Sequence, residues 1–272
     1  MTDIQNLDKP HRQHDQERQT ILDALTSVDY SSLQNNLIAS RQEGVGEWLL
    51  KHWQFKGWQS KKKSTLLCSG FPGTGKTMIA SIVVDHLKKK FEKDPNIGIA
   101  FLYCNFWQQP EQQLTDLLLS LLQQFSQRQP LLPPDVRNLY GSFLKEEVPD
   151  LPSSEITDAL GSVIGNYSRA FIVVDALDEC SVTDGVLSRF MEELFILQAK
   201  TGISLFATSR LILGIPQEFK RRGSSVIEIH PSDQAMGIYL DGHLDQLSPF
   251  VKEDPDIERE IKSAIIKAAG GM

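Results

Sequence analysis

The feature that most limits how this chain can fold is a glycine-rich loop, Gly70 to Thr77, with the sequence GFPGTGKT. The loop matches the pattern G-x-x-x-x-G-K-S/T at every fixed position. A short apolar run, Thr65 to Cys68, precedes it, and apolar residues recur at helical spacing after it, so a helix is expected to start near Lys76. A strand, a glycine loop and a helix in this order predict a phosphate-binding loop.

Each fixed position of this loop has a chemical reason. Glycine lets backbone N–H groups come close to phosphate oxygens, where a larger side chain would block them. Lys76 is expected to reach the β- and γ-phosphates of a nucleoside triphosphate, and the Thr77 hydroxyl is expected to bind Mg²⁺. The start of the next helix adds its dipole. The predicted nucleotide contacts in the loop are Gly70, Pro72, Gly73, Thr74, Gly75, Lys76 and Thr77.

The rest of the chain alternates between strand and helix patterns. Ala170 to Val174 has the strongest strand pattern, because its apolar run is continuous, as expected for a central parallel strand covered on both faces. The alternation predicts a three-layer α/β domain with a parallel sheet. Further strands are expected at Ile97–Cys104, Ile203–Ala207 and Val226–Ile229, and helices around Ile21–Val28, Trp48–Trp53, Leu114–Phe125, Leu139–Phe143, Ser153–Tyr167, Val186–Gln198, Gln234–Leu247 and Ile257–Ala269.

A second motif is acidic. Asp175 directly follows the apolar strand, and it is expected to hold Mg²⁺ at the carboxyl edge of the sheet, where open α/β folds bind their ligands. Asp178 and Glu179 are candidates to orient or deprotonate an attacking water. The alternative for this pair is that both residues are acidic caps at the start of a helix.

Two arginines are further candidates. Arg210 ends the triplet Thr208–Ser209–Arg210 after a strand, and it is a candidate to contact the γ-phosphate or to stabilise charge in the transition state. A surface salt bridge is the alternative. Arg41, in the segment RQEGVG, is a candidate to line the adenine pocket. The sequence has no Asn-Lys-x-Asp tetrad of the GTPase type, which favours adenine over guanine.

The overall charge argues against two classes of partner. The chain has 272 residues, of which 40% are hydrophobic, and a formal net charge of −7. Nucleic acids and membrane surfaces are both anionic, so we expect no binding to either. No stretch approaches the roughly 18 apolar residues that a membrane span needs. The polar first 19 residues lack the apolar core of a signal peptide.

The three cysteines are Cys68, Cys104 and Cys180. Their odd number and wide spacing fit neither a disulfide framework nor a zinc site. We therefore expect three reduced and buried thiols in an intracellular protein, with a cytoplasmic location.

In their order along the chain, these motifs resemble the NACHT family of signal-transducing (STAND) P-loop ATPases. The similarity is greatest to the fungal NACHT proteins of the heterokaryon-incompatibility and ankyrin-repeat type, whose domain is also similar to the nephrocystin-3 N-terminal region. It runs from about Ile21 to Met272 and includes RQEGVGEWLL at 41–50, like the R-x-E-G-T-G-x-W-L segment of the family. The acidic pair three residues beyond Asp175 is the family's form of this site, whereas motor ATPases usually have Glu where this chain has Ala176.

The resemblance implies a sheet order of 5-1-4-3-2 and a slow ATPase that acts as a switch, closed with ADP and oligomeric with ATP. We expect a polar or helical N-terminal arm at 1–30, the NACHT P-loop core at 31–230, and a truncated start of a helical domain at 231–272. The family continues into a winged-helix region and ligand-sensing repeats, so a fragment of a larger fungal NLR-like protein is expected.

Two other functions stay open at this point. A non-catalytic interaction module would bind nucleotide and hydrolyse none of it. A small-molecule or nucleoside kinase would share the loop, but it would also need an arginine-rich lid and an acceptor pocket, and the sequence shows no segment of that kind. The sequence does not identify the protein partners or the signal.

Overall fold

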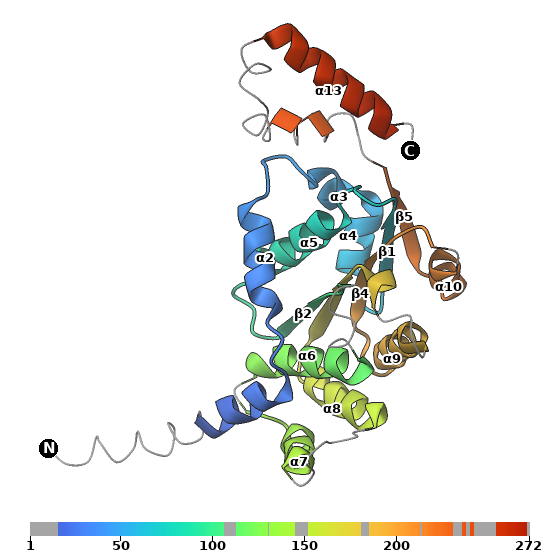
Figure 1. The fold of residues 1–272 in the computed structure, drawn as a ribbon. Coiled ribbons are helices and arrows are strands. Elements are labelled where there is room, and N and C mark those ends of the chain that lie inside the picture. Colours follow the sequence, from blue (N-terminus) through green and yellow to red (C-terminus); the bar gives the residue numbers. More distant parts are fainter. Residues whose placement is uncertain are drawn as a thin grey trace, which may run out of the picture.

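The computed structural model describes residues 16–105, 113–129, 131–144, 152–180, 185–212, 214–230, 236–237, 240–241 and 254–270. Its centre is a five-stranded sheet in the order β2-β3-β4-β1-β5, and all its neighbouring strands are parallel. From the other edge this is the order 5-1-4-3-2, so the expected sheet is confirmed (Figure 1). The strands are β1 (Thr65–Gly70), β2 (Ile97–Tyr103), β3 (Arg169–Asp175), β4 (Ser204–Ser209) and β5 (Ser225–Ile229).

The interior strands are covered on both faces, as their continuous apolar sequences predict. Every residue of β1 and β4 is buried, and so is every residue of β3 after Arg169. Burial on both faces removes the reason for an alternating polar and apolar pattern. The strand pattern at Ala170–Val174 therefore indicated both a strand and its interior position.

Helices form the two outer layers (Figure 1). In the first layer, the Trp58 ring packs on Phe171 of β3 and Phe206 of β4, with ring centroids 5.5 and 5.6 Å apart. This layer holds α2 (Tyr30–Ala39), α3 (Glu47–Lys51), α4 (Trp53–Ser60) and α5 (Lys76–Lys90). The other side of the sheet carries α6 (Leu114–Gln127), α8 (Ser153–Gly165), α9 (Val186–Thr201) and α10 (Ile215–Arg221), with α7 (Pro134–Phe143) packed on α8.

Helices α2 and α10 have no counterpart among the predicted elements. Helix α2 contains serine and asparagine, which are weak helix formers, so its sequence carries little local signal. It is stabilised by the Asp29 cap, whose carboxylate accepts from the Ser31 N–H at 2.8 Å, and by the buried Gln34. Helix α10 has a proline in its first turn, and the Phe219 ring packs on Phe195 of α9. Tertiary contacts therefore define both helices.

The N-terminal helix packs against the sheet domain. Residues 16–25 are helical, and Ile21, Leu22 and Leu25 are buried within the common core. The Gln123 amide donates to the Leu22 carbonyl at 2.9 Å, which ties this helix to α6. The proposed boundary between 1–30 and 31–230 stays a prediction, although this helix shares the core of the larger part.

The C-terminal part is described in pieces. Helix α13 (Pro255–Gly270) confirms the helix expected at Ile257–Ala269. The helix expected at Gln234–Leu247 lies largely outside the described residues, of which 236–237 and 240–241 are helical. Within the described part of the chain, no helix is long and apolar enough to cross a membrane.

Candidate functional site

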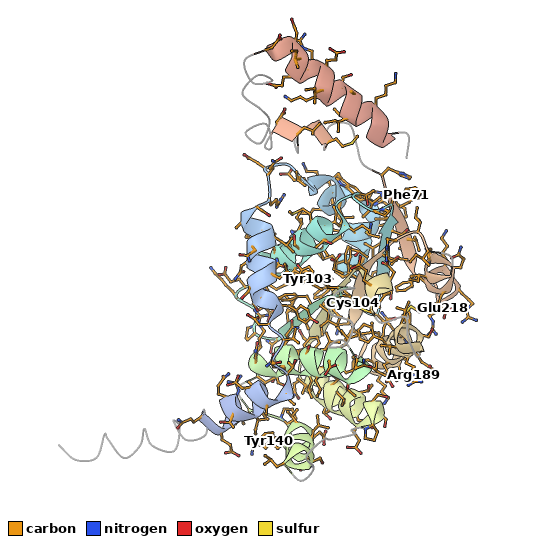
Figure 2. All side chains as sticks on the ribbon, viewed as in Figure 1. Phe71, Tyr103, Cys104, Tyr140, Arg189 and Glu218 are labelled. Atoms are coloured by element: carbon orange, nitrogen blue, oxygen red, sulfur yellow. A yellow bond between two sulfur atoms is a disulfide. The ribbon has the colours of Figure 1, made fainter. Side chains whose placement is uncertain are left out.

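The candidate residues meet at one edge of the sheet because parallel strands end there together. Strand register pairs Tyr103 with Asp175 between β2 and β3, and Cys68 with Thr208 between β1 and β4. The glycine loop continues from the end of β1 at this edge. Figure 2 labels Phe71 in the loop and Tyr103 at the end of β2. The sheet order thus brings together motifs that lie far apart in the sequence.

The glycine loop has the backbone that its sequence predicts. Gly73 and Gly75 have φ values of +79° and +80°, which residues with a side chain rarely adopt. A Cβ on Gly70 would lie 2.6 Å from the Ile229 carbonyl oxygen, so the end of β5 leaves no room for one. Helix α5 starts at Lys76, as expected. The loop backbone is mostly exposed, which leaves it accessible to an anion.

Lys76 folds back across the loop. Its Nζ donates to the carbonyl oxygens of Gly70 at 3.0 Å and Phe71 at 2.7 Å. Burial lowers the pKa of Lys76, and the nearby carboxylates of Asp178 and Asp175 oppose that shift. The cation therefore lies between the loop and the acidic turn, where it can neutralise phosphate charge.

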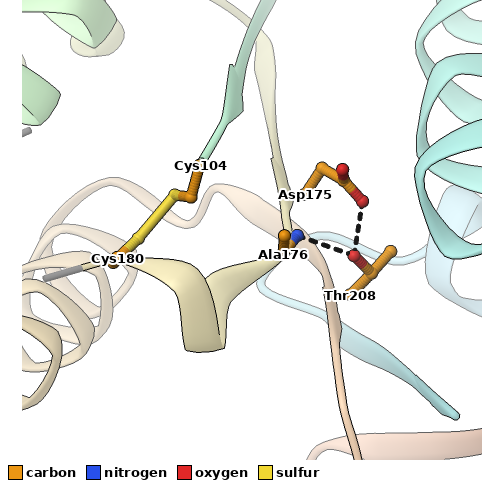
Figure 3. The surroundings of a disulfide bond; sticks show 5 residues. All are labelled: Cys104, Asp175, Ala176, Cys180 and Thr208. Carbon is orange, nitrogen blue, oxygen red and sulfur yellow. Dashed lines mark hydrogen bonds between the residues drawn. A yellow bond between two sulfur atoms is a disulfide. The ribbon is translucent and has the colours of Figure 1, made fainter. Parts of the chain in front are cut away.

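Asp175 is buried at the end of β3, and its carboxylate is hydrogen-bonded there. Its Oδ1 accepts from the Thr208 hydroxyl at 2.6 Å (Figure 3), and Thr77 lines the same cleft. Burial raises the pKa of Asp175 to about 6, and the Thr208 and Thr77 hydroxyls oppose this shift. The two residues predicted to bind Mg²⁺ thus line one cleft.

This pair fits magnesium but forms no protein-only metal cluster. The described residues contain no group of three or more His, Cys, Asp or Glu side chains that could hold a metal ion. Mg²⁺ prefers one or two protein oxygens together with phosphate oxygens and water. A hydroxyl and a carboxylate beside a phosphate loop match that preference.

Thr208 is a site residue for which the sequence motifs predict no role of its own. Its Oγ1 donates to Asp175 and accepts from the Ala176 N–H at 2.9 Å, as Figure 3 shows. One hydroxyl therefore orients the carboxylate and also fixes the chain that follows it. The only sequence signal was its position at the end of a buried strand, because the contact depends on strand pairing.

The chain turns sharply after Asp175. Ala176 has φ +51° and ψ +49°, a left-handed conformation that costs about 1–2 kcal/mol in a residue with a Cβ. The short helix η2 (Leu177–Glu179) follows, and the Glu179 N–H donates to the Ala176 carbonyl at 2.7 Å. This strained turn places the acidic pair at the sheet edge.

The structure pairs two of the candidate catalytic residues with each other. Asp178 accepts from the Arg210 backbone N–H at 2.9 Å and from the Arg210 Nε. The Asp178 side chain is 1% exposed, whereas that of Arg210 is 41% exposed. Hydrogen bonding and attraction to Asp178 raise the pKa of Arg210. The predicted catalytic roles of both residues stay predictions, and the contact itself resembles the alternative salt bridge for Arg210.

Glu179 lies on the other side of the turn, in a cleft. The cleft has a volume of about 380 Å³, and Thr77 and Asp175 also line it. Tyr103, which the sequence did not single out, lines it too; its hydroxyl donates to Gln34 of α2, and Gln34 donates to the Ser81 carbonyl of α5 at 3.0 Å. Further lining residues are Val28, Asp29, Tyr30, Leu33, Cys104, Asn105 and Ala176.

Arg41 lies in a different place. Its Nε donates to the Val45 carbonyl at 3.1 Å, and it lines a separate cavity of about 480 Å³ with Ile82 and His86 of α5. Ile82 is six residues beyond Lys76, or about 9 Å along the helix at 1.5 Å per residue. The structure therefore does not bring Arg41 to the loop, and its role at the adenine stays a prediction.

The expectation of three reduced thiols is wrong for two of them. Cys104 and Cys180 form a disulfide, with Cα atoms 5.4 Å apart and a sequence separation of 76 residues. Only Cys68 is a free cysteine among the described residues, and burial raises the pKa of its thiol. Spacing did not reveal the pair, because the parallel pairing of β2 and β3 brings the cysteines together.

Comparison with known proteins identifies relatives of this chain. A family model described as "Nephrocystin 3, N-terminal" matches residues 44–210, which contain the loop, the acidic turn and Arg210. The vegetative incompatibility protein HET-E-1 of Podospora anserina is 27% identical over 235 residues, which are 82% of this chain. The match covers 17% of the length of HET-E-1. Both findings confirm the resemblance to nephrocystin-3-like NACHT P-loop NTPases.

Two solved structures resemble this chain at low sequence identity. The ORC2 protein of Aeropyrum pernix has a TM-score of 0.48 at 13% identity, covering 74% of this chain and 51% of its own. Cdc6p from Pyrobaculum aerophilum has a TM-score of 0.49 at 16% identity, covering 80% of this chain and 53% of its own. Both scores lie below 0.5, so the fold assignment depends on the sheet order and the loop described above.

Proposed function

This chain belongs to the nephrocystin 3 N-terminal family of P-loop NTPases, and from that premise we propose that it is a NACHT-type signalling switch that binds ATP or ADP with Mg²⁺ and hydrolyses ATP slowly. The observation that carries the proposal is that Thr77, at the end of an exposed glycine loop, and Asp175 line one cleft. This arrangement would let the loop after β1, the start of α5 and the end of β3 hold a phosphate and a magnesium ion side by side.

The loop would bind the phosphates with little rearrangement of its backbone. Its glycines already hold positive φ values, so the loop needs no new strained conformation on binding. Lys76 would exchange its bonds to the Gly70 and Phe71 carbonyls for phosphate oxygens. Magnesium, held by Thr77 and Asp175, would supply positive charge at the γ-phosphate.

For hydrolysis, the geometry favours Glu179 over Asp178 as the group that orients or deprotonates water. Glu179 lines the same cleft as Thr77 and Asp175. The oxygens of Asp178 accept from the backbone N–H and the Nε of Arg210. We propose that Asp178 positions Arg210, whose partly exposed guanidinium would contact the γ-phosphate after a modest movement.

The first test is nucleotide binding by the purified chain. A fluorescent ATP analogue is titrated in Mg²⁺ against the parent, Lys76→Ala and the control Lys200→Ala, whose lysine pairs with Asp158 on the surface. Loss of a charged contact to phosphate should weaken binding by about 10- to 100-fold in Lys76→Ala alone. Equal affinity of Lys76→Ala and the parent would exclude this site.

A second measurement separates the switch from a non-hydrolysing interaction module. Phosphate release above background, absent in Lys76→Ala, supports the ATPase. Binding without release supports the interaction module, which the same site would equally allow. For the proposed switch, light scattering should show a larger particle with a slowly hydrolysed ATP analogue than with ADP, and equal sizes would argue against ATP-driven self-association.

A further inference from the structure

The disulfide lies at the same sheet edge as the proposed nucleotide site. Cys104 directly follows β2, and Cys180 directly follows Glu179 at the end of η2. The Cys104 N–H donates to the Asp175 carbonyl at 3.1 Å, which aligns the end of β2 with the end of β3. Figure 3 shows the bond beside Asp175 and Ala176. The disulfide therefore joins the two chain segments that carry Asp175 and Glu179.

Both cysteines are buried, and Cys104, which is 5% exposed, is the one that lines a cleft. Cys104 lines the 380 Å³ cleft together with Thr77, Asp175 and Glu179. Cys180 is 0% exposed and is not among the described residues that line that cleft. A small thiol entering the cleft would therefore meet Cys104, with Cys180 as the leaving group.

We propose that Cys104 and Cys180 form a reversible thiol–disulfide site, which small dithiols reduce by attack on Cys104 through the cleft of the nucleotide site. The dithiol is the reductant, and its thiolate attacks the Cys104 sulfur. A mixed disulfide forms, and Cys180 leaves as a thiolate that takes up a proton. The second thiol of the dithiol then attacks the dithiol's first sulfur, which is bonded to Cys104 in the mixed disulfide. This step releases the Cys104 thiolate. The protein disulfide gains two electrons, and the dithiol loses two as it becomes a cyclic disulfide.

Nucleotide and reductant would compete for the same space. Thr77 and Asp175, the proposed magnesium residues, line the cleft that leads to Cys104. A bound magnesium nucleotide would therefore cover the sulfur and slow its reduction. This coupling rests on the proposed function, whereas the thiol–disulfide site itself does not.

The redox state would also affect hydrolysis. The disulfide ties the turn that carries Glu179 to the end of β2, which restricts how far the carboxylate can move from the cleft. Catalytic groups act best when their position is already set. The oxidised form is therefore the faster ATPase, and its phosphate release falls several-fold on reduction.

The first experiment counts thiols in the 272-residue chain. The protein is equilibrated with oxidised dithiothreitol, denatured, alkylated and weighed by mass spectrometry. We expect one alkylated residue, Cys68, and three after treatment with reduced dithiothreitol. A Cys68→Ser control should lose the same two thiols on oxidation. Three reduced thiols throughout, or disulfide-linked dimers, would overturn the proposal.

The second experiment measures the rate of reduction by dithiothreitol under native conditions. Mg²⁺ with ATP should slow reduction several-fold in the parent and leave Lys76→Ala unaffected. If the parent binds ATP and its reduction rate does not change, entry through the nucleotide cleft is wrong. If the parent binds no ATP, the proposed function fails, while the thiol count still tests the pair.

The third experiment separates the redox effect from a general loss of structure. Phosphate release by Cys180→Ser should match that of the reduced parent and should not respond to dithiothreitol. Cys68→Ser, which leaves the pair intact, should still respond. A parent whose activity is equal in both redox states would overturn the link to hydrolysis.

Discussion

The phosphate loop and the acidic turn both follow buried strands at one sheet edge, yet they are stabilised in different ways. The loop, Gly70–Thr77, is mostly exposed and takes its shape from local glycine conformations. The turn, Asp175–Cys180, is largely buried and is held by bonds to Thr208, Arg210 and Cys104. A loop of the first kind can bind phosphate by itself. A turn of the second kind depends on distant parts of the chain, which suits it to control hydrolysis.

The largest effect should come from Glu179→Gln in the turn. Removal of a general base typically slows a reaction by about 10²- to 10⁴-fold, so phosphate release should fall by that order while nucleotide affinity stays near that of the parent. A single-turnover assay measures the first quantity and a binding titration the second. Glu155→Gln, at an exposed position in α8, is the control. A much larger loss in Asp178→Asn than in Glu179→Gln would reverse the assignment of the acidic pair.

The next effect concerns the loop. Gly70→Ala should destabilise the fold by about 1–3 kcal/mol, because its Cβ would overlap the backbone at Ile229. Gly57→Ala is the matched control: it lies within α4 with open space around its Cα, and alanine there should stabilise by about 0.5–1 kcal/mol. Urea unfolding followed by circular dichroism measures both. Equal stability of Gly70→Ala and the parent would mean that the loop tolerates a side chain there.

A smaller effect is expected where the turn meets β4. Thr208→Val keeps the shape of the side chain but removes the hydroxyl that joins Asp175 to the Ala176 N–H. Loss of these buried bonds should cost about 1–2 kcal/mol of stability, and Mg²⁺-dependent binding should weaken with it. Thr201→Val, whose hydroxyl donates to the Leu197 carbonyl near the end of α9, should change stability less. If both variants behave alike, Thr208 does not position Asp175.

The smallest effect should come from the contact between Asp178 and Arg210. Because the arginine side chain is 41% exposed, solvent screening limits the pair to about 0.5–1 kcal/mol. A double-mutant cycle with Asp178→Asn and Arg210→Ala, measured by urea unfolding, isolates that term. A coupling energy near zero would show that the Arg210 side chain does not help to hold the turn, which would weaken the contrast between the turn and the loop.

Features that depend on local residues could be predicted from the sequence, whereas features that depend on distant contacts could not. Three features could be predicted because their sequence signals are local. The loop has glycines at positions of positive φ, helix α5 has helical periodicity from Lys76, and the strand before Asp175 has a continuous apolar run. Helix α2 was not, because its stability comes from Asp29 and from the buried Gln34, which bonds to α5. The cysteine pair was mispredicted because spacing along the chain says nothing about two strand ends that meet in space.

The sequence by itself determined the phosphate loop, the parallel α/β class and the family, since each depends on residues within a few positions of one another or on motifs in a set order. The tertiary structure decided which side chains share the site. The strand order places Thr208 on Asp175, the turn after Asp175 separates Asp178 from Glu179, and the ends of β2 and β3 bring Cys104 to Cys180. Such contacts form only when the sheet assembles, because parallel neighbours are joined by long crossover segments.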